Sequence, residues 1–464
     1  DRRWWIFGTI AVGILLGSFT NSSLNAVLPV IRDDLEAPMA GVQWVLMSFL
    51  LVNSSLLLSM GRLGDLIGHR RVYLSGLGVF TGAVILAITA GSLPWLIGAR
   101  VGQAMGAAML VEVAPAITTL AFPPHHRGRV LGMQATTVYV GLALGPSVGG
   151  FITDRLGWRA VFFVCLPLAA ATAVLAWRFI PAYRPKAREG TFDVIGAVLF
   201  MIGLVALLYA LTRGSEWGWL APPTLGLIAL SAVLLTAFVL WEGRHPSPML
   251  DLGLFKLRLF RMAVISSVLN FICFYGLFFL MPFYLITARG WSAGQAGVIF
   301  MALPLSMASV APFSGLASDR IGSRVLASAG MIVLAIGLVI LGLLGETTPP
   351  LVIAAGLVVC GLGIGLFTSP NNSAIMGSAP IERRGVASGV VATARSVGMV
   401  LGIALTGALF TSLLALNGGT VESGGPPFLA AMHWTCWAIA GCALAGAVTS
   451  YRRGGATEGV GDRV

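Results

Sequence analysis

Charged side chains are scarce in this chain, and their scarcity excludes the soluble class of proteins. Asp, Glu, Lys and Arg make up 10% of the 464 residues, whereas soluble domains carry about a quarter. Hydrophobic residues account for 57% of the chain instead. Because lipid does not solvate charge, such a composition is typical of an integral membrane protein.

Cysteine and histidine are also rare, and their placement excludes several kinds of site. None of the five cysteines belongs to a C-x-x-C pair, so neither a disulfide framework nor a zinc site is indicated. The sequence places no paired carboxylates at one membrane depth. It likewise places no clustered histidines and no activated nucleophile at a common depth. A membrane-embedded enzyme is therefore disfavoured, and we expect no metal and no cofactor, with a proton gradient as the energy source.

Long apolar runs dominate what is present. About 20 apolar residues cross the roughly 30 Å of bilayer hydrocarbon as a helix. We therefore expect an all-α integral membrane protein. The sequence predicts fourteen spans, near 4–30, 40–61, 71–91, 94–120, 128–153, 158–180, 193–212, 222–241, 261–287, 293–316, 325–344, 351–371, 385–414 and 428–451.

The net charge of +11 could by itself indicate a nucleic-acid-binding surface. The basic residues lie in short loops between the spans, however. With the N-terminus inside, most of the 29 Lys and Arg residues fall on the inner side, as the positive-inside rule requires. This predicts a multi-pass protein of the cell (inner) membrane with both termini cytoplasmic and no nucleic-acid partner.

Two pairs of segments indicate an internal repeat. "GRLGDLIGHRR" from Gly61 recurs more weakly as "GLASDRIGSR" from Gly315. "PPHHRGRVLG" from Pro123 is similar to "APIERRGVASG" from Ala379, at nearly the same separation. Each pair connects spans of the same rank in the two halves. The duplicated unit is therefore six spans, and parallel repeats of this kind are a transporter plan.

The repeat divides the chain into three predicted parts. These are an N-terminal six-helix bundle at 1–180, two inserted transmembrane helices with a cytoplasmic amphipathic linker at 181–260, and a C-terminal six-helix bundle at 261–464. Within the linker, "PMLDLGLFKLRLFRM" from Pro248 alternates apolar and basic residues. This pattern predicts an amphipathic helix on the inner membrane surface.

Three motifs resemble those of the major facilitator superfamily. "GRLGDLIGHRR" resembles the family's signature between spans 2 and 3, and "RVGQAMGAA" from Arg100 resembles its fourth-span motif. "GLALGPSVGG" from Gly141 is similar to the fifth-span pattern of the antiporter branch. Because fourteen spans are predicted, the chain resembles the fourteen-span, proton-driven drug exporters of this family. The resemblance covers essentially the whole chain. The resemblance implies a major facilitator-type fold of two six-helix bundles plus two inserted helices (14 transmembrane helices).

The first motif predicts a cytoplasmic latch. Its glycines allow a tight turn between two helices, and its carboxylate can bond to a neighbouring helix N-terminus, where the dipole favours an anion. In transporters that resemble this chain, the latch is made in the outward-facing state and broken in the inward-facing one. Ordinary orienting charges in a hydrated loop are the alternative. The candidate latch residues are Gly61, Asp65, Gly68, Arg70, Arg71, Asp319 and Arg324.

The fifth-span motif predicts close helix packing. Small residues at fourfold spacing let another helix approach, and a proline bends the span. The resemblance implies that this bend lies between the two halves and seals the inner side, with static packing as the alternative. The motif residues are Gly141, Gly145, Pro146, Gly149 and Gly150.

Three ionisable residues, Arg100, Glu112 and Arg395, fall well inside predicted spans. Arg100 and Glu112 lie about 18 Å apart along one helix, so they cannot pair directly. A lone carboxyl in a low-dielectric cavity can load and release a proton, which makes Glu112 the candidate proton carrier. A permanently bonded brace, held for example by Arg395, is the alternative. Arg100 is predicted to be a helix clamp, and the resemblance gives it a gating or proton-linked role.

A polar stretch, "SFTNSSLN" from Ser18, interrupts the first span, and polar residues recur on spans 2, 9 and 12. Spans 1 and 9 are equivalent in the repeat. Such groups could line a water-filled chamber between the halves, or they could hydrogen-bond one helix to another. The candidate cavity residues are Ser18, Asn21, Ser22, Asn25, Asn53, Asn270, Tyr275, Asn371 and Asn372.

One position departs from the resemblance. The fourteen-span exporters carry an acid in the first span, in the pattern L-D-x-T-x-x-N-x-x-L-P. The aligned stretch here is "FTNSSLNAVLP", which places Thr20 where the acid belongs. Either Glu112 has taken over proton coupling, or coupling is different or absent.

These observations predict a transporter that works by alternating access. We expect proton-coupled efflux of amphipathic or hydrophobic small molecules. A lipid or lysolipid translocator and an uncoupled facilitator stay open as alternatives. The expected partners are a small-molecule or lipid-like substrate, protons and membrane lipids, with the chain acting as a monomer.

Overall fold

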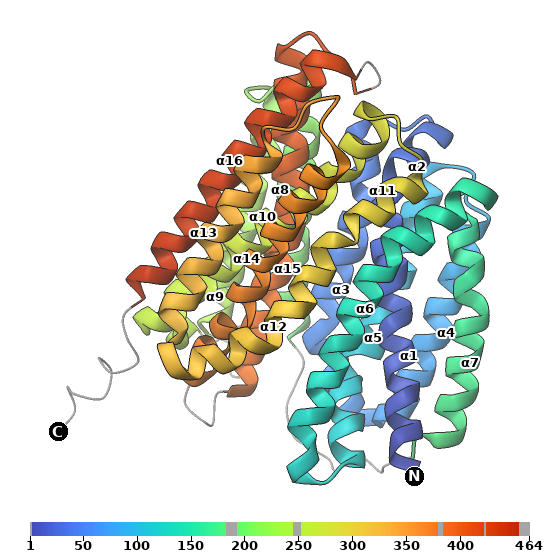
Figure 1. Cartoon of the computed structure of the whole chain (residues 1–464). Helices are drawn as coiled ribbons and strands as arrows, with labels where there is room; N and C mark the ends of the chain where they lie inside the picture. The colour runs from blue at the N-terminus through green and yellow to red at the C-terminus, as the bar shows by residue number, and fades with distance from the viewer. Residues whose placement is uncertain (1, 182–192, 245–251, 379–383, 422–423, 454–464) are drawn as a thin grey trace, which may run out of the picture. The chain divides into compact units, whose positions relative to one another are not determined.

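The computed structural model describes residues 2–181, 193–244, 252–378, 384–421 and 424–453, and every regular element in these ranges is helical (Figure 1). Twelve helices in these ranges are long and apolar enough to cross a membrane. The all-helical, multi-spanning architecture expected from the hydrophobic runs is therefore confirmed. The expected count of fourteen spans is not confirmed, since α3 and α6 are not among the twelve.

The helix bounds follow the predicted runs closely. Helices before the middle of the chain are α1 (Arg2–Ala26), α2 (Leu28–Asp34), α3 (Met39–Ile67), α4 (His69–Ile88), α5 (Leu93–Ala121), α6 (Pro124–Leu156), α7 (Ala160–Phe179), α8 (Val194–Trp217) and α9 (Pro222–Glu242). After them come η1 (Leu252–Lys256), α10 (Arg258–Phe283), η2 (Tyr284–Ala288), α11 (Ala293–Phe300), α12 (Ala302–Ile321), α13 (Ser323–Leu341), α14 (Pro350–Ser378), α15 (Arg384–Leu416) and α16 (Gly425–Arg452).

Proline and glycine mark many of the helix ends. Proline stands in the first turn of α2, α5, α6, α9 and α16, where its missing N–H is not needed. Gly68 follows α3 with φ 100°, and Gly322 follows α12 with φ 85°. Only glycine adopts this left-handed conformation readily. The two glycines are aligned in the internal repeat, so both halves turn between helices in the same way.

The chain forms two compact units. The first contains residues Asp1–Met201 and Leu285–Met301, and the second contains Ile202–Tyr284 and Ala302–Val464. In the first unit α1 packs against α5, α6 and α7, while α5 packs against α3 and α4. In the second unit α10 packs against α14, α15 and α16, while α14 packs against α12 and α13. These helix pairs of the two units correspond one to one, and the predicted division into two six-helix bundles with two inserted helices stays a prediction.

Two predicted spans are each divided between two α-helices. The first, at 4–30, ends as α1 at Ala26, and α2 begins at Leu28 with proline in its first turn. The span at 293–316 consists of α11 and α12, separated at Met301. α11 belongs to the first unit, although it comes from the second half of the sequence.

The described part of the linker differs from the expected amphipathic helix. Residues Leu252–Lys256 form the short 3-10 helix η1. Leu254 is 2% exposed and packs with Phe260, Ile375 and Val390 in a hydrophobic cluster of the second unit. The apolar side of this segment is thus buried against the protein, because the cluster offers it a better-packed surface than lipid does.

Candidate transport site

Two serines of the polar stretch on α1 hydrogen-bond to α6. The Ser22 hydroxyl donates to the Leu142 carbonyl at 2.8 Å, and the Ser23 hydroxyl donates to the Gly145 carbonyl at 3.0 Å. Both acceptors are backbone groups of a neighbouring helix. The arrangement of Ser22 is therefore that of a helix-packing contact, and its role in lining a chamber stays a prediction.

The glycines of the fifth-span motif make this close approach of α1 and α6 possible. A Cβ atom built on Gly141, Gly145 or Gly149 would crowd the Cβ of a serine on α1, so a larger residue would push the helices apart. The three pairs of positions are Gly141 with Ser18 at 2.6 Å, Gly145 with Ser22 at 2.5 Å, and Gly149 with Ser23 at 2.5 Å.

Thr20 and Asn21 point to other helices of the first unit. The Thr20 hydroxyl donates to the Leu16 carbonyl at 2.7 Å and lies 3.2 Å from the Cys165 sulfur on α7. Asn21 accepts a hydrogen bond from α5. The position that carries an acid in similar exporters therefore faces α7 and is buried. The polar stretch divides its side chains among α5, α6 and α7.

Arg100 is completely buried and joins three helices of the first unit. Its Nε donates to the Val45 carbonyl on α3 at 3.0 Å, its Nη1 to Gln103 Oε1 at 2.7 Å, and its Nη2 to Asn21 Oδ1 at 2.8 Å. Its guanidinium lies 4.2 Å from the centroid of the Phe49 ring. These partners are all neutral, so dipoles and a ring stabilise the charge in place of a carboxylate. Such geometry suits a helix clamp.

Glu112 and Arg395 lie in different units. Glu112 is half-buried on α5, about 18 Å along the helix from Arg100. Arg395 is exposed on α15 in the second unit. The structure leaves Glu112 beyond the reach of Arg100, in agreement with the helical spacing. Its role as proton carrier or brace stays a prediction.

The remaining candidate cavity residues have varied surroundings. Asn25 is buried and Asn53 is half-buried in the first unit. Asn270 is fully buried on α10, where its Nδ2 donates to the Met331 sulfur at 3.3 Å. Among the described residues, its Oδ1 has no hydrogen-bond partner. The role of Asn270 in lining a cavity stays a prediction.

Asn371 connects three elements of the second unit. Its Nδ2 donates to the Ala263 carbonyl on α10 at 3.0 Å, and its Oδ1 accepts from Arg453 Nη1 at 3.0 Å. The side chain is fully buried, whereas the adjacent Asn372 is half-buried. Asn371 thus positions Arg453, a residue that the sequence did not single out.

Aromatic residues on α10 form a buried cluster around Tyr275. The ring centroid of Phe274 lies 5.0 Å from that of Tyr275 and 5.6 Å from that of Phe278. Phe271 joins at 6.5 Å from Phe274. Such rings offer both faces and edges, which suit contact with planar apolar molecules.

Two basic residues of the predicted latch lie just after Gly68. Arg70 donates from Nη2 to the Trp177 carbonyl near the C-terminus of α7, at 2.5 Å. A cation is favoured there by the helix dipole. Arg71 is exposed. In this structure Arg70 therefore holds α4 to α7 within the first unit.

The counterpart of the latch in the second unit is only partly described. The Arg324 guanidinium lies 4.1 Å from the centroid of the Tyr451 ring on α16. The side chains of Asp65 and Asp319, and the surroundings of Gly61, lie outside the described part of the structure. The carboxylate bonds of the latch therefore stay predictions.

The other residues of the fifth-span motif contact α11. A Cβ atom on Gly297 would overlap the Pro146 carbonyl oxygen, and one on Gly150 would overlap the Ala293 carbonyl oxygen. The two backbones are therefore in direct contact (Figure 1). Substitution at either glycine would separate α6 from α11.

Asp154, near the end of α6, caps the N-terminus of α11. Its two carboxylate oxygens accept from the N–H groups of Ala293 at 2.9 Å and Gly294 at 2.8 Å. Ser292 and Gln295 complete a capping box at the same helix end. Sequence reasoning missed Asp154, although the Ser-x-x-Gln pattern predicts a helix start that attracts an anion.

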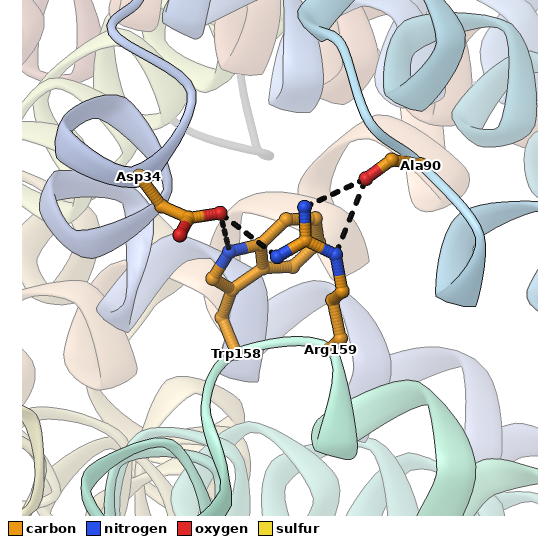
Figure 2. A network of polar contacts seen from close by, with 4 residues as sticks. All are labelled: Asp34, Ala90, Trp158 and Arg159. Atoms are coloured by element: carbon orange, nitrogen blue, oxygen red, sulfur yellow. Dashed lines mark hydrogen bonds and ion pairs between the residues drawn. The ribbon is translucent and has the colours of Figure 1, made fainter.

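A polar network ties together three connections at one end of the first unit (Figure 2). Asp34 Oδ2 accepts from Trp158 Nε1 at 2.9 Å and from Arg159 Nη1 at 2.8 Å. Arg159 also donates to the Ala90 carbonyl from Nε at 3.2 Å and from Nη2 at 2.8 Å. The hydrogen bond from Trp158, followed by that from Arg159, lowers the pKa of Asp34. The network fixes α2 to the segments that follow α4 and α6.

Comparison with known proteins identifies a family and several relatives. A family model described as Major Facilitator Superfamily matches residues 10–403. The chain is 31% identical to the riboflavin transporter RibZ of Clostridioides difficile (strain 630), over 90% of either protein. It is 32% identical to the multidrug resistance protein Stp of Mycobacterium tuberculosis (strain CDC 1551 / Oshkosh), over 89% of this chain and 77% of Stp. It is 30% identical to the multidrug efflux pump LfrA of Mycolicibacterium smegmatis, over 90% of this chain and 82% of LfrA.

A solved structure shares the fold. It is a bacterial homolog of the human lysosomal transporter Spinster, in an inward-facing and unoccupied conformation. The TM-score is 0.72, with 98% of this chain and 97% of that chain covered, at 15% sequence identity. The likeness at this identity concerns the fold alone.

Proposed function

The chain belongs to the major facilitator superfamily, and we propose that it exports amphipathic or hydrophobic small molecules by alternating access, driven by protons. Membrane transport itself follows from the family and from the transporter relatives, which also set the chain apart from enzymes. Two relatives are multidrug proteins. Their names support a broad range of apolar substrates and outward transport across the cell membrane.

We include α3 and α6 among the spans, which gives fourteen. α3 has 29 residues and α6 has 33, so at 1.5 Å per residue either helix is long enough to cross about 30 Å of hydrocarbon. α3 packs on α5, and α6 packs on α1, both of which are apolar enough to span. With fourteen alternating spans and the positive-inside bias, both termini are cytoplasmic.

The observation that carries proton coupling is the arrangement of ionisable residues on α5. The hydrogen bonds of Arg100 all go to neutral groups, and Glu112 lies about 18 Å away along the helix. Glu112 is half-buried within the candidate span Leu93–Thr118. An acid at such a position is a functional group by default, because it is costly to keep in a membrane.

We place the outer gate at the contact of α6 with α11. Gly150 and Gly297 bring the two backbones together, and Asp154 holds the first turn of α11 by two charge-assisted hydrogen bonds. Access from the outer side requires this contact to separate. The contact between α6 and α11 is either made or separated, so the gate can act as a two-state element.

Transport in proteoliposomes with an imposed pH gradient tests the proposal. We expect the wild type to accumulate ethidium against its concentration only when the gradient is present, and Glu112→Gln to lose that accumulation. Glu216→Gln is the matched control, since Glu216 is a partly exposed acid paired with Arg213 on α8. Equal transport with and without the gradient would show an uncoupled facilitator. Full uphill transport by Glu112→Gln would assign the proton to another group.

A planar heteroaromatic molecule is the second candidate substrate. The riboflavin transporter RibZ is among the relatives, and the buried rings around Tyr275 supply stacking surfaces. Riboflavin then competes with ethidium in the same vesicles, and Tyr275→Ala weakens riboflavin transport more than ethidium transport. Unaltered ethidium transport in a large excess of riboflavin excludes a shared site.

A further inference from the structure

Three buried polar groups at one end of the second unit lack hydrogen-bond partners among the described residues. They are Nη2 of Arg453, Nε of Arg324 and the hydroxyl of Ser450. Arg453 directly follows α16 and is only 2% exposed, and Ser450 is fully buried. Buried donors are nearly always paired in folded proteins, so three in one region require an explanation.

The packing of α13 against α16 brings these groups to the same place. Ser450 lies about one helical turn before Arg453 and therefore on the same side of α16. Arg324 stands in the first turn of α13, with its guanidinium 4.1 Å from the centroid of the Tyr451 ring. Burial, followed by the charge of Arg324, lowers the pKa of Arg453 to about 10. The two guanidinium groups are thus close enough to repel each other.

Among the described residues, the two arginines contact uncharged groups. Arg453 Nη1 donates to Asn371 Oδ1 at 3.0 Å, and the other end of that amide is fixed on the Ala263 carbonyl. Arg324 faces an uncharged ring. Arg453 is buried and Arg324 beside it is half-buried, and such a pair of cations is stable only if a negative group compensates it.

We propose that Arg324, Ser450 and Arg453 bind a phosphate group at this end of the second unit. Phosphate oxygens accept several hydrogen bonds at once, and a planar guanidinium matches them in pairs. The N-cap residue of α13, Gly322, provides no side-chain hydrogen bond, so the N–H groups and dipole of that helix end add to the attraction of an anion.

The location suggests two sources for the phosphate. α13 begins and α16 ends here, and both are candidate spans, so the site lies at the level where lipid headgroups meet water. The headgroup of an anionic lipid and free phosphate present the same chemistry. The proposal does not depend on proton coupling or on the transported substrate.

Thermal unfolding of the full chain in detergent micelles tests the site, with dioleoylphosphatidylglycerol and inorganic phosphate as separate probes. We expect a saturable rise of the melting temperature of the wild type. Arg324→Gln and Arg453→Gln should each weaken the apparent affinity about tenfold, as expected for loss of a charge-assisted hydrogen bond. Arg452→Gln is the matched control, because it removes the same charge from an exposed neighbour on α16. It should bind like the wild type.

The arms of the experiment separate the outcomes. If phosphatidylglycerol alone raises the melting temperature, the ligand of the site is a lipid headgroup. If inorganic phosphate raises the melting temperature as well, the site binds free phosphate. The proposal is overturned if neither probe gives a saturable response, if zwitterionic dioleoylphosphatidylcholine gives the same response, or if Arg452→Gln loses as much affinity as Arg324→Gln. Should the buried change Arg453→Gln prevent folding, Arg324→Gln decides, since Arg324 is only half-buried.

Discussion

A guanidinium inside a protein is stable only if its N–H groups find acceptors, and Arg100 shows how this chain meets that need. Its acceptors are Val45, Gln103 and Asn21. Lysine keeps the charge, but its compact ammonium cannot reach three acceptors arranged around a planar fork. We expect Arg100→Lys to lower the free energy of unfolding by about 2–4 kcal/mol, measured by thermal or denaturant unfolding in detergent.

The control for Arg100→Lys is the same change at an exposed arginine. Arg155 lies near the end of α6, exposed and stacked on Phe151. Arg155→Lys should have the same free energy of unfolding as the wild type, because an exposed cation gains little stabilisation from its neighbours. If both variants unfold alike, the buried hydrogen bonds of Arg100 do not stabilise the first unit.

Asp34 gives a pH dependence whose sign follows from its partners. Trp158 and Arg159 lower its pKa in the folded state, so the network stabilises the fold above the pKa of an unfolded aspartate, about 3.9. That contribution is lost as the pH falls through the folded-state pKa. The melting temperature of Asp34→Asn should therefore lie below that of the wild type above about pH 5, and the two should converge in acid.

The neighbouring carboxylate serves as the comparison for Asp34→Asn. Asp33 has an exposed side chain that pairs with Arg32, outside the network of Figure 2. Asp33→Asn should show a much smaller difference from the wild type at every pH. A difference for Asp34→Asn that is constant from pH 7 down to pH 3 would contradict the role of its charge.

At the residue scale, the sequence predicted which side chains are unusual but not which neighbours they meet. Helical spacing placed Ser18 and Ser22 on one face of α1, and either a chamber or a second helix could cover that face. The choice depends on α6, whose Gly141 and Gly145 leave room for the serines. Arg453 escaped attention because a terminal arginine resembles an ordinary orienting charge until its burial is known.

Among the elements, α11 depends on a residue of another helix for its first turn. Asp154 accepts from the N–H groups of Ala293 and Gly294. Asparagine keeps the size of the side chain but loses the charge and one acceptor. We expect Asp154→Asn to speed hydrogen–deuterium exchange of these amides about tenfold, the effect of losing a charge-assisted hydrogen bond.

A neighbouring change on α6 tests whether that effect is local. Arg155→Gln alters the adjacent exposed residue and should leave the exchange of the α11 amides unchanged. Faster exchange in both variants would point to a general loosening of α6. Unchanged exchange in Asp154→Asn would show that the capping box of Ser292 and Gln295 holds α11 without it.

Most helix positions were predictable because most long apolar runs form a single α-helix, and proline or glycine stands at many of the helix ends. The predicted span at 222–241 is α9, Pro222–Glu242. Breaks inside a run were not predictable, since hydropathy continues unchanged through Val27 and Met301. The linker was misjudged for a related reason. Its apolar and basic pattern suits a membrane surface, but Leu254 finds a protein surface nearby.

For the molecule as a whole, the repeat was the most informative part of the sequence. Its two copies require the same turn between helices, and Gly68 and Gly322 share that conformation. The helix pairs within each unit agree as well. The sequence did not predict that α11 belongs to the first unit, because this depends on backbone contacts between segments distant in the sequence.

The number of spans determines which exposed residues lie on the inner side of the membrane and which lie on the outer side. Asp33, Arg71 and Arg155 are exposed, and the proposed fourteen-span topology would place Arg71 inside and the other two outside. We expect a membrane-impermeant maleimide to label Asp33→Cys and Arg155→Cys in right-side-out vesicles, and Arg71→Cys only after permeabilisation. The native cysteines are buried or half-buried, so the unsubstituted chain provides the background.

The labelling pattern tests α3 and α6 separately. α3 lies between Asp33 and Arg71, whereas α4, α5 and α6 lie between Arg71 and Arg155. If α3 does not cross the membrane, Asp33→Cys and Arg71→Cys are labelled from the same side. If α6 does not cross, Arg71→Cys and Arg155→Cys are labelled from the same side. Opposite sides for both pairs require that both helices span, and labelling of Arg71→Cys alone from outside would invert the whole topology.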